Sequence, residues 1–109
     1  MVERSRTWTA LVTFEVVESG ALGLPGHAHG AVGYMAVRAA AEDDLRQALL
    51  AELKEAGLRL VEIDDIRMLA EGEFPDALDG HLAANMREWL PGKRTVWGTV
   101  RPYYGDGEA

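Results

Sequence analysis

Apolar and polar side chains alternate along much of the chain, and this pattern predicts β-strands. Between residues 7 and 18 the alternation is strict, with Trp8 and Phe14 in the same row. A period of two residues places alternate side chains on opposite faces of a strand. Residues 31–39 and residues 94–103 also show patterns that are typical of extended chain. We therefore predict strands in all three segments. In the first of them we expect one row to face the helices, namely Trp8, Ala10, Val12, Phe14 and Val16.

Two further segments show the spacing of amphipathic helices. Residues 42–56 form the clearest helix, since leucines recur every four residues and Gly57 stands where a helix commonly ends. Residues 75–89 are the second predicted helix, with Pro75 at its first position. Its predicted apolar stripe consists of Leu78, Leu82, Met86 and Trp89.

Two segments are less regular. Residues 58–69 read as a strand whose alternation changes phase at Asp64 and Asp65, which predicts a bulge or sharp bend. Residues 19–33 contain five glycines and a proline. We predict a long loop there.

These elements follow one another in the order ββαβαβ and predict a single α+β domain over residues 1–109. Residues 1–6 and 105–109 are expected to be tails. Strand–helix–strand connections usually join parallel strands. We therefore predict a mixed four-stranded sheet with both helices on one face, and with the first strand inserted between the second and the third. This two-layer sandwich resembles a ferredoxin-like architecture with its elements permuted, a resemblance that carries no function.

Two helices on one face would leave the other face of the sheet uncovered. A part-apolar open face on a small protein favours association with a partner. We predict a homodimer formed through this surface, because two-fold homodimers are the commonest oligomers. The residues expected on this partner-binding face are Leu11, Val17, Trp97, Arg101 and Tyr103.

Charge and composition narrow the classes of partner. The net charge is −7, and residues 42–79 carry twelve acidic and four basic side chains. Nucleic acid binding needs clustered basic residues, so nucleic acid is not an expected partner. An acidic surface instead favours a protein partner with a basic surface. Cysteine is absent, and we see neither a signal peptide nor a membrane span, so we expect a cytoplasmic protein.

Few residues suggest chemistry. His27 and His29 flank Ala28 in a glycine loop, and with His81 they form a candidate site for a divalent metal. The pattern does not require a bound metal, because two histidines in a glycine-rich segment also occur in solvated loops that bind none. The two serines, Ser5 and Ser19, do not lie on a strand-to-helix turn of the kind that hydrolases use.

The leading functional hypothesis is therefore a small acidic interaction module without enzymatic activity, of a regulatory or inhibitor type. The alternative is a small-ligand or metal-binding protein, with or without enzymatic activity. It would use the loop at residues 26–30 together with the open face of the sheet.

Overall fold

The computed structural model describes residues 5–104 and confirms the predicted order of elements. The predicted tails lie almost entirely outside the described residues, and Arg6 is already part of the first strand. The segment between the first two strands is shorter than predicted, because the second strand begins at Gly30. The elements are β1 (Arg6–Val16), a 3₁₀ turn (Ala21–Gly23), β2 (Gly30–Ala39), α1 (Glu42–Glu55), β3 (Leu58–Met68), α2 (Gly80–Arg87) and β4 (Thr95–Tyr103).

The four strands form one sheet in the order β3-β1-β2-β4, and every neighbouring pair is antiparallel. The predicted insertion of β1 between β2 and β3 is confirmed. The prediction of a mixed sheet is wrong. The connection through α2 does not return to a neighbour of β3 but crosses to the opposite edge, where β4 pairs antiparallel with β2.

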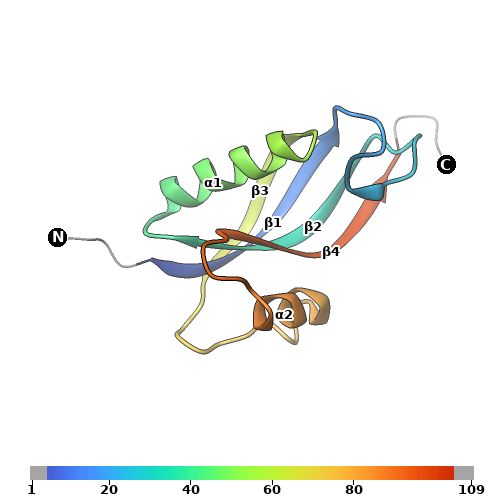
Figure 1. Ribbon diagram of the computed structural model, residues 1–109. Helices are drawn as coiled ribbons and strands as arrows, with labels where there is room; N and C mark the ends of the chain where they lie inside the picture. Colours follow the sequence, from blue (N-terminus) through green and yellow to red (C-terminus); the bar gives the residue numbers. More distant parts are fainter. Residues whose placement is uncertain (1–4, 105–109) are drawn as a thin grey trace.

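Helix α1 covers one face of the sheet and contacts β2, β3 and, less extensively, β4 (Figure 1). The expected row of β1 faces it, and Ala10, Val12 and Phe14 are fully buried there. The helix contributes Leu45, Leu49 and Leu53 to the same core. Burying a leucine side chain stabilises a fold by about 2 kcal/mol, so this layer is the main hydrophobic core.

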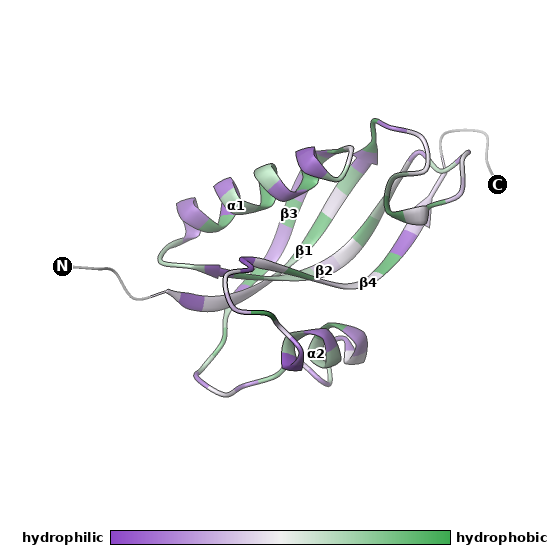
Figure 2. Ribbon diagram, in the orientation of Figure 1, coloured by the Kyte–Doolittle hydropathy of each residue, from purple (hydrophilic) through white to green (hydrophobic). Residues whose placement is uncertain are grey.

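Helix α2 lies on the other face of the sheet, so the prediction of both helices on one face is wrong (Figure 1). Its Leu82 and Met86 form a second small core with Ala36 of β2. Ala36 belongs to the row of β2 opposite to Met35, which packs beneath α1. Hydrophobic side chains therefore pack on both sides of the central sheet. Figure 2 shows hydrophobic positions in both helices and along the strands between them. The molecule has three layers where we predicted two.

The start of α2 also differs from the prediction. The segment from Pro75 to Leu78 forms a turn, and the helix begins at Gly80 because Asp79 caps it. The carboxylate of Asp79 accepts hydrogen bonds from the backbone N–H groups of His81 and Leu82, at 3.0 and 3.1 Å. Such a cap satisfies donors that have no partner within the helix.

Both edges of the sheet are irregular. In β3 the pairing with β1 shifts twice, and Asp65 adopts a left-handed conformation with φ 49°, which agrees with the predicted bend. In β4 the pairing with β2 shifts between Gly33 and Met35, and Pro102 lies within the strand. Over residues 5–104, neither helix is long and apolar enough to cross a membrane.

Candidate functional site

The face of the sheet that carries α2 has two hollows, one on each side of the helix. The cross-strand pair Thr7 and Arg38 lies in one hollow, and the pair Leu11 and Tyr34 lies in the other. Between them Thr9 and Ala36 are fully buried. The N-terminal end of α2 therefore borders one hollow, and its C-terminal end borders the other.

The larger hollow, which we call the Arg101 groove, has a volume of about 660 Å³. Its floor is formed by β1, β2 and β4 of the sheet, and its wall by the start of α2 with the turn before it. The residues that line it are Leu11, Val32, Gly33, Tyr34, Leu78, Asp79, Gly80, His81, Thr99 and Arg101. Its size falls within the range of small-molecule sites, and its floor is partly apolar.

Asp79 fixes the wall of this groove, and both of its carboxylate oxygens accept hydrogen bonds from the protein. Besides capping α2, its carboxylate accepts hydrogen bonds from the backbone N–H and the hydroxyl of Thr99, at 2.8 and 3.1 Å. Burial acts against its charged form, but the hydrogen bonds from Thr99, Leu82 and His81 outweigh burial and lower the pKa of Asp79. The carboxylate therefore joins α2 to β4.

A second carboxylate holds the phenol of Tyr34. The Tyr34 hydroxyl donates a hydrogen bond to Asp65 at 3.0 Å, and Arg67 donates to the other oxygen of Asp65 at 2.9 Å. The hydrogen bonds from Arg67 and Tyr34 lower the pKa of Asp65, whereas burial and the bond to Asp65 raise the pKa of Tyr34. The tyrosine ring is thus fixed at the floor of the Arg101 groove as a neutral phenol.

Arg101 is the cation of the groove. Among residues 5–104, no carboxylate lies within 4.0 Å of its guanidinium group, although five other arginines have such partners. His81 lies in the wall formed by α2, is exposed, and also has no acidic partner in this part of the chain. Arg101 therefore forms no ion pair with the residues that the structure describes.

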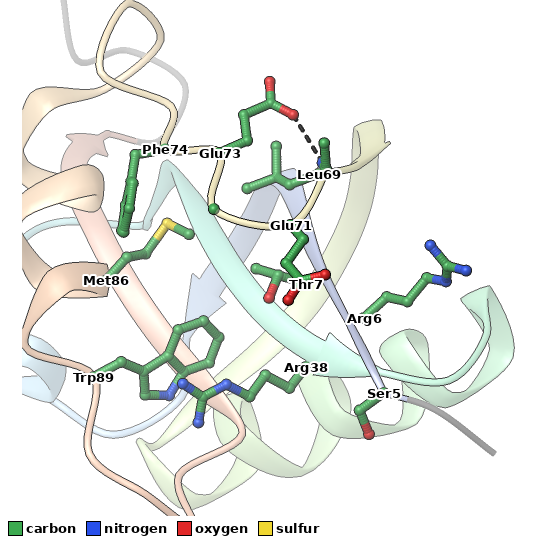
Figure 3. Close-up of a pocket in the computed structure, with 12 residues that line it drawn as sticks. Ser5, Arg6, Thr7, Arg38, Leu69, Glu71, Glu73, Phe74, Met86 and Trp89 are labelled. Carbon is green, nitrogen blue, oxygen red and sulfur yellow. Dashed lines mark hydrogen bonds between the residues drawn. The ribbon is translucent and has the colours of Figure 1, made fainter.

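The smaller hollow, which we call the Trp89 pocket, has a volume of about 340 Å³ (Figure 3). It lies between the start of β1, the end of β2, the turn after β3 and the end of α2. The Arg38 guanidinium lies 4.0 Å from the centre of the Trp89 ring. Phe74 and Met86 form the wall beside them. Glu71 extends from the turn toward Thr7 (Figure 3).

The structure separates the residues predicted to form one partner-binding face. Leu11 and Arg101 lie together in the groove. Trp97 lies instead on the α1 face, where its ring meets Phe14 edge to face and its Nε1 donates to Glu52 at 3.2 Å. Trp97 does not lie on the face predicted for it, because β4 is irregular: two residues of β4 lie opposite one residue of β2 at this point, so Trp97 and Val100 both face the α1 core.

The remaining two residues of that set lie outside the groove lining. Val17 follows the end of β1 and is 64% exposed, while its backbone N–H donates to Gly57. Tyr103 is half-buried, and its hydroxyl donates to the carbonyl of Phe14 at 3.3 Å. Burial and the charge of Glu15 raise the pKa of Tyr103.

The three histidines have different neighbours. His27 stacks on Tyr104 with ring centres 4.8 Å apart, and His29 lies 3.9 Å from the carboxylate of Glu15. His81 belongs to the groove wall. Over residues 5–104, no three side chains of His, Cys, Asp or Glu are grouped so that they could hold a metal ion.

The roles of Asp79 and Tyr34 and the presence of the Trp89 pocket were not predicted from the sequence. For Asp79 a signal was present. An aspartate that caps a helix accepts hydrogen bonds from the backbone two and three residues later, which are His81 and Leu82 here. For Tyr34 and the pocket no local signal exists, since their neighbours come from distant strands.

Comparison of the chain with protein-family models, with curated proteins and with solved structures finds no match. The function is therefore argued from the geometry of these two hollows.

Proposed function

We propose that the protein binds a small organic anion, with a carboxylate as its charged group, in the Arg101 groove. The observation that carries this proposal is the guanidinium of Arg101, which has no carboxylate partner among residues 5–104 and lies beside a partly apolar floor. An arginine presents several N–H donors in a planar fork that matches the two oxygens of a carboxylate. The remainder of the ligand would contact Leu11, Val32 and Leu78.

The charges around the groove limit the kind of anion. Asp64 lies directly opposite Leu11 on the neighbouring strand, so acidic side chains stand on the β3 side of the floor. The whole chain carries a net charge of −7. A long polyanion would be repelled by this surface, whereas a small ligand with one charged end can place that end at Arg101 and avoid the acids.

The test uses probes of defined chemistry. Straight-chain mono- and dicarboxylates and their matched primary amides are titrated into ¹⁵N-labelled protein, and backbone amide shifts are followed. We expect a carboxylate to shift the amides of Leu11, Val32 and Thr99, and the matched amide to leave them unchanged. Arg101→Gln should weaken that binding at least about tenfold, since charge-assisted bonds to arginine are strong.

The matched control is Arg46→Gln. Arg46 pairs with Glu42 on α1, and both belong to the layer on the opposite face of the sheet. This variant should bind the carboxylate as the unaltered protein does. The proposal fails if no carboxylate shifts the groove amides, or if the shifts persist unchanged in Arg101→Gln.

Self-association is the second candidate, and the layout of charge on the same face favours it. Glu62 and Asp64 belong to the β3 edge strand and lie opposite Thr13 and Leu11, whereas Arg101 belongs to β4 at the other edge. If this face of each copy is turned toward the other, a two-fold axis that runs parallel to the strands would bring each acidic edge opposite the Arg101 of a second copy. Light scattering at micromolar concentration should then give twice 11.9 kDa. A monomer at that concentration would remove this candidate.

A further inference from the structure

We infer that the Trp89 pocket is a second, separate binding site, and that its ligand is a free α-amino acid with an apolar side chain. The inference does not depend on the Arg101 groove, because the two hollows share no lining residue. It rests on Arg38 and Glu71, two of the charged residues that line the pocket, and on the apolar wall of Phe74 and Met86. Arg6 also lines the pocket, but its side chain extends away from Trp89 (Figure 3).

The first charge is Arg38. Its guanidinium carbon lies over the Trp89 ring, 4.0 Å from the ring centre, and its Nη1 donates to the carbonyl of Lys93 at 3.4 Å. Arginine has five N–H donors, so most of them remain available. Among residues 5–104, no carboxylate lies within 4.0 Å of this group. A ligand carboxylate would complete its bonding.

The second charge is Glu71. It belongs to the tight turn that overhangs the pocket, where Glu73 accepts a hydrogen bond from the Ala70 N–H at 2.8 Å and Gly72 has φ 79°. Glu73 is thus occupied by the turn, whereas Glu71 points into the hollow (Figure 3). Glu71 has no basic partner within 4.0 Å in the described part of the chain, and it does not pair with Arg38.

Among residues 5–104, Arg38 and Glu71 thus border one pocket without an oppositely charged partner, and two such charges match a zwitterion. A ligand carboxylate would bind Arg38, and a ligand ammonium would bind Glu71, with the Thr7 hydroxyl nearby. Phe74 and Met86 then supply the wall for an apolar side chain. The volume of about 340 Å³ lies at the small end of ligand sites, which suits an amino acid better than a nucleotide cofactor.

The experiment follows the indole N–H signals of the three tryptophans while methionine, leucine or phenylalanine is added. Trp89→Phe identifies the Trp89 signal. We expect a saturable shift of that signal alone, because Trp8 and Trp97 pack against the α1 core. N-acetylmethionine lacks the ammonium and methioninamide lacks the carboxylate, so each should bind at least about tenfold more weakly than methionine.

Two variants test the assignment of charges. Arg38→Gln and Glu71→Gln should each weaken methionine binding at least about tenfold, while Arg46→Gln and Glu55→Gln on α1 should not change it. Glu71 is exposed on a turn, so its replacement leaves the core intact even if Arg38→Gln disturbs the fold. The inference is overturned if none of the three amino acids shifts the Trp89 signal. It is also overturned if Glu71→Gln binds methionine as tightly as the unaltered protein does, or if the unaltered protein binds methioninamide as tightly as methionine.

Discussion

We expect the carboxylate of Asp79 to contribute more to the free energy of unfolding than is usual for a carboxylate in a surface loop. It caps α2 through His81 and Leu82, and it also binds both polar groups of Thr99. Losing a helix cap costs about 1 kcal/mol. Losing the hydrogen bonds to Thr99 costs about 1 kcal/mol more, since water can replace part of the bonding at the Thr99 N–H. We therefore expect Asp79→Ala to lower the free energy of unfolding by about 2 kcal/mol.

Urea unfolding, followed by circular dichroism and tryptophan fluorescence, measures this loss. With a denaturant slope of roughly 2 kcal/mol/M, the midpoint should fall by about 1 M. The matched control is Asp76→Ala. Asp76 pairs with Arg87 at 2.9 Å on the surface, where such pairs contribute less than about 1 kcal/mol. The reasoning is refuted if Asp79→Ala costs no more than Asp76→Ala.

Acid provides an independent check of the same carboxylate. Because the pKa of Asp79 is lowered in the folded protein, its contribution is complete above the ordinary pKa of about 4 and is lost as the pH falls through the lowered value. The difference in stability between the unaltered protein and Asp79→Ala should therefore shrink on acidification. The difference between Asp79→Asn and Asp79→Ala should stay constant, because neither side chain titrates.

Two further predictions test the packing of α2 onto the sheet. Leu82→Ala should lower the free energy of unfolding by about 3 kcal/mol because Leu82 is fully buried, whereas Leu50→Ala on α1, where the side chain is 50% exposed, should cost under about 1 kcal/mol. Equal losses in urea unfolding would contradict this. Gly98→Ala should cost about 2 kcal/mol, because an added Cβ would lie 2.8 Å from the Cβ of Leu82. Gly80→Ala meets open space and should be neutral or stabilising by up to about 1 kcal/mol. A melting temperature of Gly98→Ala at or above that of Gly80→Ala would exclude tight contact between α2 and β4.

Local patterns predicted the elements better than their placement. The helix predicted at 42–56 is observed as Glu42–Glu55, since regular leucine spacing and a terminal glycine are local signals. The face on which α2 packs is not local information. The sequence did hold one clue, because β2 is apolar in both rows, with Met35 on one side and Ala36 on the other. A strand that is apolar on both faces is usually covered on both.

The site was predicted in part for the same reason. Leu11 and Arg101 were placed on one face by simple alternation, and the structure brings them together. Alternation failed for Trp97, because one additional residue in β4 reverses the phase of every side chain before it. The pairing of Tyr34 with Asp65 depends on the left-handed bend in β3, and no pattern within either strand predicts it.

The irregular edges of the sheet have a consequence for behaviour at high concentration. A long, straight edge strand presents free backbone groups on which further chains can assemble into fibrils. Here β3 is broken by two shifts in register and carries Arg59, Glu62 and Arg67, while the Thr99 N–H in β4 is already bound by Asp79. Neither border therefore offers a continuous template for cross-β growth. The fold resists aggregation by its shape as well as by its negative charge.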